Sequence, residues 1–344
     1  MVRVGIVGYG YAGRRFHAYL IGLVPSMQVT AVMTRDPERQ RQAAEELHCR
    51  IYGDLESFLA DPGIDLVVLA TPHDTHAPLA IAAMDAGKHV VTDKVMCLSV
   101  AEADAMIAAR ERNHVVLSVF HNRRWDWDYL TVQHCRAAKL LGRLLSVEQA
   151  VTNYRPPRGW RAEQRRSGGI LFDWGAHLVD QLLLLNDTPV ASVWCGITAS
   201  TWDIDIGSYA KLVVRFADGM LGEVNTGNAV RLSKPRWYIV GSAGTLVKEG
   251  LDPQERAMLQ GDIDQAQEDP NLRARIVTDI GGLTTTLVVE SVHGSWRRYY
   301  ENIAEAIERG APLAVTAESA RRNVAVLEAA MRSVTTGESI AVAI

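Results

Sequence analysis

The run Val2-Arg3-Val4-Gly5-Ile6-Val7-Gly8-Tyr9-Gly10-Tyr11-Ala12-Gly13 decides the fold of this chain. A short apolar strand is followed at once by a glycine-rich turn, after which a helical pattern begins. Gly8 permits the sharp turn, Gly10 lets backbone approach a pyrophosphate, and Gly13 allows close packing of helix on strand. The helix N-terminus offers free N–H groups to phosphates. A glycine turn without a ligand is the alternative, but the position favours a dinucleotide-binding turn made of Gly8, Tyr9, Gly10, Tyr11, Ala12 and Gly13.

Short β-branched segments alternate with Ala- and Glu-rich helical patterns over the first third of the chain. Such alternation calls for parallel strands joined by right-handed crossovers. Residues 1–122 are therefore predicted to form an α/β Rossmann domain with a doubly wound parallel sheet. The predicted strands are 2–7, 29–33, 65–70, 89–92 and 115–120, and the predicted helices are 12–23, 37–47, 78–86 and 100–112.

Strands follow one another in the second part, residues 123–344, which holds all eight tryptophans. Ala217-Asp218-Gly219 is predicted to be a hairpin turn. Residues 168–185 are helical in their second half, and the polar stretch 254–274 is expected to be a surface excursion. This order predicts an α+β domain with helices on one side of an antiparallel or mixed sheet. The predicted strands are 146–154, 190–202, 209–216, 220–230, 236–240 and 245–248.

Composition excludes several classes of protein. The 344 residues are 48% hydrophobic and 22% charged, which is typical of a globular chain rather than a disordered one. The 36 basic and 40 acidic residues give a net charge of −4, which disfavours a nucleic-acid binder. No basic-then-apolar leader and no long apolar stretch is visible, so we expect a cytoplasmic protein without a membrane partner. The scattered cysteines suggest reduced thiols and no metal site.

The end of the second predicted strand bears on cofactor choice. An NAD site usually has an acid there, bonded to the ribose 2′-hydroxyl. This chain has Thr34 followed by Arg35, a pair that accepts a 2′-phosphate which a carboxylate would repel. The alternative is that Arg35 only covers the adenine and Asp36 merely begins the next helix. NADP is therefore favoured, and NAD remains possible.

Four stretches together resemble one family. They are the glycine turn, Ala70-Thr71-Pro72-His73-Asp74-Thr75-His76, Ala86-Gly87-Lys88-His89-Val90-Val91-Thr92-Asp93-Lys94, and Gly168-Gly169-Ile170-Leu171-Phe172-Asp173-Trp174-Gly175-Ala176-His177. The chain resembles the Gfo/Idh/MocA oxidoreductases over nearly its whole length. Residues 120–126 and 250–255 resemble the NADP-dependent scyllo-inositol dehydrogenases in particular.

The resemblance implies a Rossmann domain followed by a substrate-binding domain with an open, mainly antiparallel sheet. It also implies hydride transfer between a nicotinamide and a hydroxyl- or keto-bearing carbon of a cyclitol or sugar. Two departures from the family pattern stand out. Asp93-Lys94-Val95 replaces the usual Glu-Lys-Pro, so the backbone that aims Lys94 is expected to differ, because a non-proline cis bond costs about 3 kcal/mol. His73 stands where the family commonly has Asn. Further cofactor contacts are expected from Ala70, Thr71, Pro72, His73, His76, Asp93 and Lys94.

Reversible alcohol oxidation needs a group that both takes and returns the hydroxyl proton, and a histidine with a pKa near neutral suits both directions. His177 is the candidate, and Asp173, four residues earlier, would share its side of a helix. The family resemblance implies a catalytic set of Lys94, Asp173 and His177, with the ammonium stabilising negative charge on the substrate oxygen. The alternatives are a helix-terminal carboxylate beside a buried histidine, and a solvated lysine.

Substrate contacts are expected from residues in and around the same segments, although core packing or ion pairing would explain each equally well. An aromatic face that covers a sugar ring is one such contact. The arginines between residues 155 and 166 suggest a charged loop or an anionic-substrate contact. The candidates are Arg123, Arg124, Trp125, Trp160 and Asp180.

Several functions fit these features besides a cyclitol or sugar dehydrogenase. A reductase of keto sugars or sugar nucleotides would use the arginine loop for phosphates. An NAD-assisted glycosidase would hold its dinucleotide tightly. A cofactor-sensing regulatory protein would explain the drift to Asp93 and Val95. Homo-oligomerisation is expected, because an open sheet with one uncovered face would expose an apolar patch.

Overall fold

The computed structural model describes residues 1–342 and 344. The chain forms two compact units. The first comprises Met1–His121 and Trp296–Val324, and the second comprises Asn122–Ser295 and Ala325–Ile344. A late segment of the chain therefore completes the unit that the N-terminus begins.

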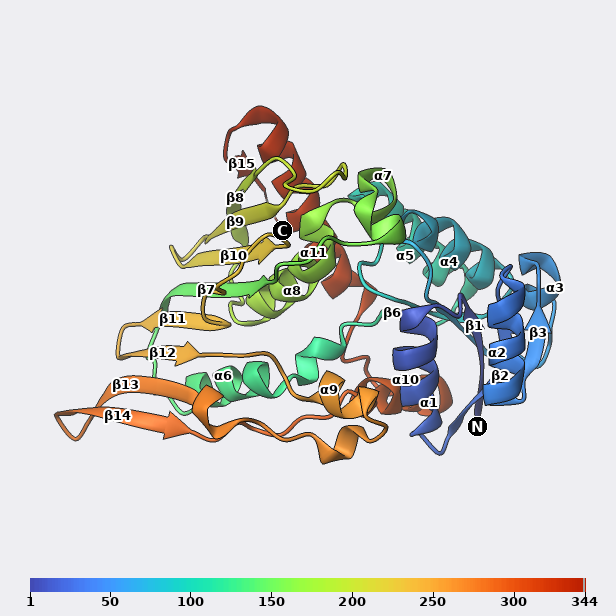
Figure 1. Ribbon diagram of the computed structural model, residues 1–344, viewed down its shortest axis with the longest axis horizontal. Helices are drawn as coiled ribbons and strands as arrows, with labels where there is room; N and C mark the ends of the chain where they lie inside the picture. The colour runs from blue at the N-terminus through green and yellow to red at the C-terminus, as the bar shows by residue number, and fades with distance from the viewer. Residues whose placement is uncertain (343) are drawn as a thin grey trace. The chain divides into compact units, whose positions relative to one another are not determined.

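The first unit contains a six-stranded sheet in which every pairing is parallel. Its strands are β1 (Val2–Val7), β2 (Met27–Met33), β3 (Arg50–Tyr52), β4 (Leu66–Leu69), β5 (His89–Thr92) and β6 (Leu117–Val119). Their order, β3-β2-β1-β4-β5-β6, is that of a doubly wound dinucleotide-binding fold (Figure 1). The predicted α/β Rossmann class is confirmed.

Helices connect these strands, and polar caps fix where several of them begin. The side chains of Asp36, Asp54 and Ser99 each accept a backbone N–H of the helix that follows. The predicted helix 12–23 is not uniform, because Gly13–Ala18 is π-helical before α1 begins. The helices of this unit are α1 (Tyr19–Gly22), α2 (Pro37–Leu47), α3 (Leu55–Leu59), α4 (His76–Asp85), α5 (Val100–Asn113) and α10 (Arg297–Arg309).

The second unit contains a nine-stranded mixed sheet. Its strands are β7 (Leu144–Thr152), β8 (Val190–Ile197), β9 (Tyr209–Phe216), β10 (Leu221–Gly227), β11 (Trp237–Gly241), β12 (Gly244–Lys248), β13 (Ala274–Ile280), β14 (Leu283–Val289) and β15 (Ile340–Ala341). The order is β14-β13-β12-β11-β7-β10-β9-β8-β15, laid out in Figure 1. Among the described strands of this second sheet, only β7 and β10 pair in parallel, so the mainly antiparallel class is confirmed. Gly219, with φ +89°, makes the predicted hairpin turn between β9 and β10.

Helix α8 (Ala176–Leu184) packs on one face of this sheet. Gln149 of β7 donates to the Leu178 carbonyl at 3.0 Å, and a Cβ at Gly222 of β10 would meet Leu182 at 2.4 Å. The other helices are α6 (Trp127–Ala137), α7 (Gln164–Ser167) and α9 (Gln254–Leu259). The expected surface excursion at 254–274 is partly wrong, because α9 buries Ala257 and Met258.

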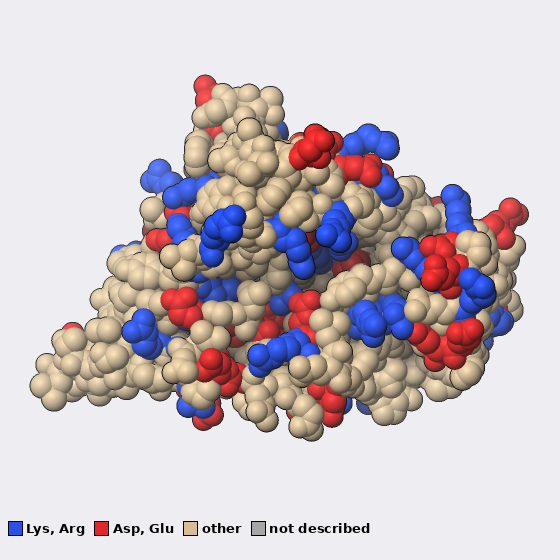
Figure 2. Space-filling model, viewed as in Figure 1, with Lys and Arg blue, Asp and Glu red and all other residues tan. Residues whose placement is uncertain are grey.

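The longest helix, α11 (Ala317–Thr336), contains the division between the units at Val324. Across the described chain, including α11, no helix combines the length and apolar character that a membrane span requires. Acidic and basic side chains are interspersed on the face shown in Figure 2.

All four cysteines are free thiols. Cys97, Cys135 and Cys195 are buried, whereas Cys49 is partly exposed. Burial raises the pKa of Cys135 to about 11 and that of Cys195 to about 12. Burial also raises the pKa of Cys49.

Candidate active site

In the glycine turn after β1, backbone atoms lie so close to Gly8 and Gly13 that these two positions have no room for a side chain. Gly8 has φ +92°, and a Cβ there would lie 2.5 Å from the Ala70 carbonyl oxygen. A Cβ at Gly13 would lie 2.1 Å from the Gly8 carbonyl oxygen. At Gly10 the nearest atom would be the Arg39 guanidinium, 3.6 Å away. Gly8 and Gly13 are thus required for the fold, while Gly10 keeps the outer side of the turn open.

The two tyrosines of the turn differ in role. Tyr9 is 2% exposed, and its hydroxyl donates to Glu46 of α2 at 2.8 Å. Arg14 also pairs with Glu46, so this carboxylate ties the turn to α2. Tyr11 is 55% exposed. Only Tyr11 presents its ring at the surface, next to the open side of the turn.

The end of β2 carries the residues predicted to choose between NAD and NADP. Thr34 is buried, whereas Arg35 is exposed. Asp36 accepts backbone N–H groups from Glu38 and Arg39 and so caps α2, as one alternative had it. Arg39, which was not among the predicted cofactor residues, is brought beside Gly10 by α2. Its position one helical turn after Asp36 was the available signal.

The segments after β4 and β5 are joined by a buried histidine. His76 Nδ1 lies 2.8 Å from the Val95 carbonyl oxygen, and Nε2 lies 3.0 Å from that of Thr71. Burial lowers the pKa of His76. His73 is also buried. His76 therefore joins the two segments at this edge of the sheet, where Ala70, Thr71 and Pro72 follow β4, and the His73 ring centroid lies 5.7 Å from that of His76.

Asp93, Lys94 and Val95 follow β5. Asp93 Oδ1 accepts the backbone N–H of Lys94 at 2.8 Å. Burial raises the pKa of Asp93, but His17, Lys94 and His76 outweigh that effect and bring the pKa below its ordinary value. The Lys94–Val95 peptide bond is cis. The expectation that valine would remove a cis bond here is therefore wrong.

In the second unit, Asp173 and His177 lie on consecutive turns that begin α8. Leu171–Gly175 is π-helical, so the regular α-helical spacing expected between these residues does not hold. His177 is buried, and its ring centroid lies 5.8 Å from that of Trp174. The Arg123 guanidinium sits 4.2 Å above the Trp174 ring. The structure thus brings His177 and Arg123 to the same Trp174 ring, and Asp173 directly precedes that tryptophan.

Two other predicted substrate residues bond to each other. Arg124 Nη2 and Nε donate to the two carboxylate oxygens of Asp180 at 2.6 and 2.8 Å. Both side chains are at least nine-tenths buried. Trp125 ends a 3₁₀ turn, and its carbonyl accepts from Gln254. Trp160 is partly exposed in another 3₁₀ turn, with the Arg161 guanidinium 4.5 Å above its ring.

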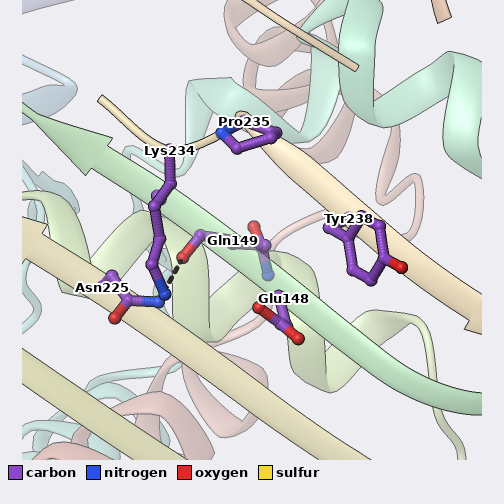
Figure 3. Close-up of a pocket in the computed structure, with 7 residues that line it drawn as sticks. Glu148, Gln149, Asn225, Lys234, Pro235 and Tyr238 are labelled. Atoms are coloured by element: carbon purple, nitrogen blue, oxygen red, sulfur yellow. Dashed lines mark hydrogen bonds between the residues drawn. The ribbon is translucent and has the colours of Figure 1, made fainter. Parts of the chain in front are cut away.

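A pocket of about 210 Å³ lies on the sheet face opposite α8 (Figure 3). Side chains alternate along a strand, so Glu148 points away from the face to which Gln149 turns its side chain. Tyr238 is the cross-strand partner of Glu148 and shares that outer face. None of the lining residues belongs to the predicted site. They are Glu148, Gln149, Ala150, Asn225, Lys234, Pro235 and Tyr238.

Comparisons with known proteins cover both units. The family profile described as an oxidoreductase family with an NAD-binding Rossmann fold matches residues 2–121. The profile of the same family's C-terminal alpha/beta domain matches residues 138–342. A solved structure from Bacillus subtilis, yvaA, titled as an oxidoreductase, aligns with a TM-score of 0.92 and 31% identity over 99% of this chain and 98% of that one.

Several curated relatives carry named activities, among them the following three. The scyllo-inositol 2-dehydrogenase (NADP⁺) IolW of Bacillus subtilis is 33% identical over 96% of this chain and 93% of its own length. The myo-inositol 2-dehydrogenase of Thermotoga maritima is 28% identical over 73% and 76%. The 1,5-anhydro-D-fructose reductase of Ensifer adhaerens is 25% identical over 74% and 78%.

Proposed function

This chain belongs to the Gfo/Idh/MocA family of oxidoreductases, and on that premise we propose that it transfers hydride between NADP(H) and a carbon of a cyclitol or sugar. The family makes it an NAD(P)-dependent dehydrogenase or reductase of CH–OH groups. The observation that carries the finer proposal is the 33% identity, over 96% of the chain, to an NADP-dependent scyllo-inositol dehydrogenase.

NADP is the proposed cofactor. Thr34 offers no carboxylate to repel a 2′-phosphate, and Arg35 and Arg39 supply two guanidinium groups near the turn. The open side of Gly10 fits the approach of a pyrophosphate to backbone N–H groups. When bound, the nicotinamide supplies or accepts the hydride.

The chain's own residues handle the proton. His177 takes the proton of the substrate hydroxyl during oxidation and returns it during reduction. Asp173 orients the imidazole or binds a neighbouring hydroxyl. Lys94 holds the substrate oxygen and stabilises the negative charge that develops there. Further substrate contacts are proposed for Arg123, Arg124, Trp125, Trp160 and Asp180, with Arg124 and Asp180 acting as a bonded pair.

A reductase of keto sugars is the second candidate. The relative of this chain that is named 1,5-anhydro-D-fructose reductase favours it. The chemistry is the same reaction in reverse, so the same residues would serve. A preference for keto sugars with NADPH over polyols with NADP⁺ would select this candidate.

Purified protein is tested by mixing it with NADP⁺ or NAD⁺ and a panel of inositols and sugars, and with NADPH and keto sugars. Absorbance of the reduced nicotinamide reports turnover. We expect turnover of an inositol with NADP⁺ in excess of that with NAD⁺. Turnover only with nucleotide-linked sugars, or none with any substrate, would contradict the proposal.

Homo-oligomerisation through the open sheet face is also proposed. Trp194, Leu221 and Tyr238 lie on the face opposite α8 and are 38%, 46% and 39% exposed. Glu148, Glu223 and Val213 lie between Tyr238 and Trp194 in the same cross-strand row, so an interface on this face would bury separate apolar side chains among charged ones. Light scattering after size-exclusion chromatography should show an oligomer for the wild type and a smaller species for Leu221→Glu.

A further inference from the structure

Three polar side chains of the first unit lie behind Lys94 and take no part in the proposed proton transfer. The Tyr300 hydroxyl lies 2.6 Å from His17 Nδ1. His17 Nε2 faces Asp93 Oδ1 across 3.9 Å. The same Asp93 oxygen accepts the Lys94 backbone N–H at 2.8 Å. A series of polar groups, interrupted by the 3.9 Å gap between His17 and Asp93, therefore runs from α10 to the residue that bears the proposed catalytic ammonium.

We propose that His17 is a positioning residue for Lys94, acting through the Asp93 carboxylate, with Tyr300 fixing the orientation of the His17 ring. The proposal rests on the proposed function of Lys94 in hydride transfer. His17 touches neither substrate nor reacting atoms in this scheme. It keeps the carboxylate in place, and the carboxylate keeps the peptide N–H of Lys94 in place.

Tyr300 decides which nitrogen of the His17 ring carries the proton. Burial, with Tyr299 and Asp93 nearby, raises the pKa of Tyr300 well above its ordinary value, so the phenol keeps its proton. A phenol that donates to Nδ1 leaves the ring proton on Nε2. That N–H then points at the Asp93 carboxylate. The opposite tautomer would turn a bare nitrogen lone pair towards a negative charge.

The buried surroundings of His17 strengthen its interactions with Tyr300 and Asp93. His17 and Tyr300 are fully buried. The Phe120 ring centroid lies 4.5 Å from that of His17, so the pair sits among aromatic rings where a low dielectric strengthens hydrogen bonds and charge interactions. The titratable groups around His17 and Asp93 are Lys94, His76, Tyr299 and Tyr300. Asp93 carries the negative charge among them.

The length of the Asp93 side chain sets its distance from the His17 ring. The 3.9 Å between Asp93 Oδ1 and His17 Nε2 is longer than a hydrogen bond. A side chain one methylene longer would close that gap. Asp93→Glu is therefore expected to tighten the contact with His17.

The chain offers a matched pair of variants. Tyr299 and Tyr300 are adjacent on α10 and both buried, but the Tyr299 hydroxyl donates to Ser118 at 2.9 Å rather than to His17. Tyr300→Phe and Tyr299→Phe each delete one buried hydroxyl. Only the first removes the partner of His17.

Hydrogen exchange of the full-length protein without cofactor tests the proposal directly. We expect the peptide that contains Lys94 to exchange about tenfold faster in Tyr300→Phe than in wild type, and at the wild-type rate in Tyr299→Phe. Equal rates in the two variants would overturn the proposal. Nitrogen NMR of the histidine rings should place the His17 proton on Nε2, and a proton on Nδ1 would overturn it as well.

Kinetics separate this proposal from the proposed function. Tyr300→Phe should lower kcat about fivefold while the KM for substrate and the affinity for NADP stay unchanged, as expected of a residue that acts on a catalytic group from behind. If the wild type turns over no polyol or keto sugar, the proposed function fails. The exchange rates and the His17 tautomer would still decide whether the positioning network exists.

Discussion

The glycine turn of the first unit and the segment around α8 in the second unit are built by different means. In the turn, backbone atoms approach so closely that a Cβ at Gly13 would lie 2.1 Å from a carbonyl oxygen. Around α8, buried charged side chains form ion pairs, as Arg124 does with Asp180. Adding side-chain atoms to the turn should therefore destabilise the protein. In the α8 region, removing a charge should destabilise it.

The largest effect is expected at His177. His177→Ala should lower kcat by about 10²- to 10⁴-fold, because it removes the proposed acid and base. The exposed His134 on α6 provides the control, and His134→Ala should leave kcat unchanged. Steady-state kinetics with the preferred substrate measure both. Full activity of His177→Ala would remove this residue from the mechanism.

Loss of charge in the same unit is tested at Asp180. Asp180→Asn should lower the free energy of unfolding by about 3–5 kcal/mol, because Arg124 would keep a buried charge without its carboxylate. The double variant Arg124→Met/Asp180→Leu should recover most of that loss. Urea unfolding measures all three proteins. A loss below about 1 kcal/mol for Asp180→Asn would mean that this pair behaves like a surface ion pair.

The turn is tested by adding single methyl groups. Gly13→Ala should lower the free energy of unfolding by about 3 kcal/mol, because the new Cβ would collide with the Gly8 carbonyl. Gly10→Ala meets no atom closer than 3.6 Å, so it should fold normally and instead weaken NADP binding. Thermal melts and cofactor titrations separate the two effects. Equal melting temperatures of the two variants would contradict the contrast drawn here.

The buried carboxyl of Asp252 makes the stability of the second unit depend on pH. Burial and the nearby Asp128 raise the pKa of Asp252 to about 6. A carboxyl whose pKa is raised by folding stabilises the protein fully below its unfolded pKa, and this contribution is lost as pH rises towards 6. We expect a loss of about 3 kcal/mol between pH 4 and pH 7 from this group. Urea unfolding of Asp252→Asn should show a shallower decline with pH than the wild type does, and parallel declines would contradict the assignment.

The smallest effect is expected at Arg39, which lies beside the turn without closing it. Arg39→Ala should weaken NADP binding about tenfold, or about 1.4 kcal/mol, and leave NAD binding nearly unchanged. Arg41 is exposed on the same helix, so Arg41→Ala is the matched control. Fluorescence titration with both dinucleotides measures the effect. Equal losses for NADP and NAD would assign Arg39 to the shared part of the cofactor.

The sequence predicted features whose causes are local. The glycine turn, the hairpin at Gly219 and helix α8 each depend on residues within a few positions of one another. The π-helical segments at 13–18 and 171–175 were missed, because an apolar pattern that suits an α-helix also suits a π-helical turn. The bond between Arg124 and Asp180 joins residues 56 positions apart. No local pattern indicates which of two distant charges will meet.

The same limit applies within the first unit. Arg39 reaches Gly10 only because α2 folds back beside the turn. Tyr300 meets His17 across 283 positions of sequence, because Trp296–Val324 returns to the unit formed by the N-terminal residues. The contact between Tyr300 and His17 has no signal in spacing or periodicity, whereas the place of Arg39 in the first turn of the predicted helix was a local one. Tyr300 is proposed to support the predicted site from behind, whereas Arg39 is proposed to contact the cofactor.

The uneven accessibility of the thiols gives the protein a built-in labelling position. Cys49, which precedes β3 at the edge of the first sheet, is the partly exposed thiol, and the other three are buried. A maleimide fluorophore at mildly alkaline pH should therefore attach at this single position in the unmutated protein. Because Arg50, the next residue, pairs with Ala31 in parallel, the dye would lie beside the middle of β2 rather than at its Thr34 end, without any engineered cysteine.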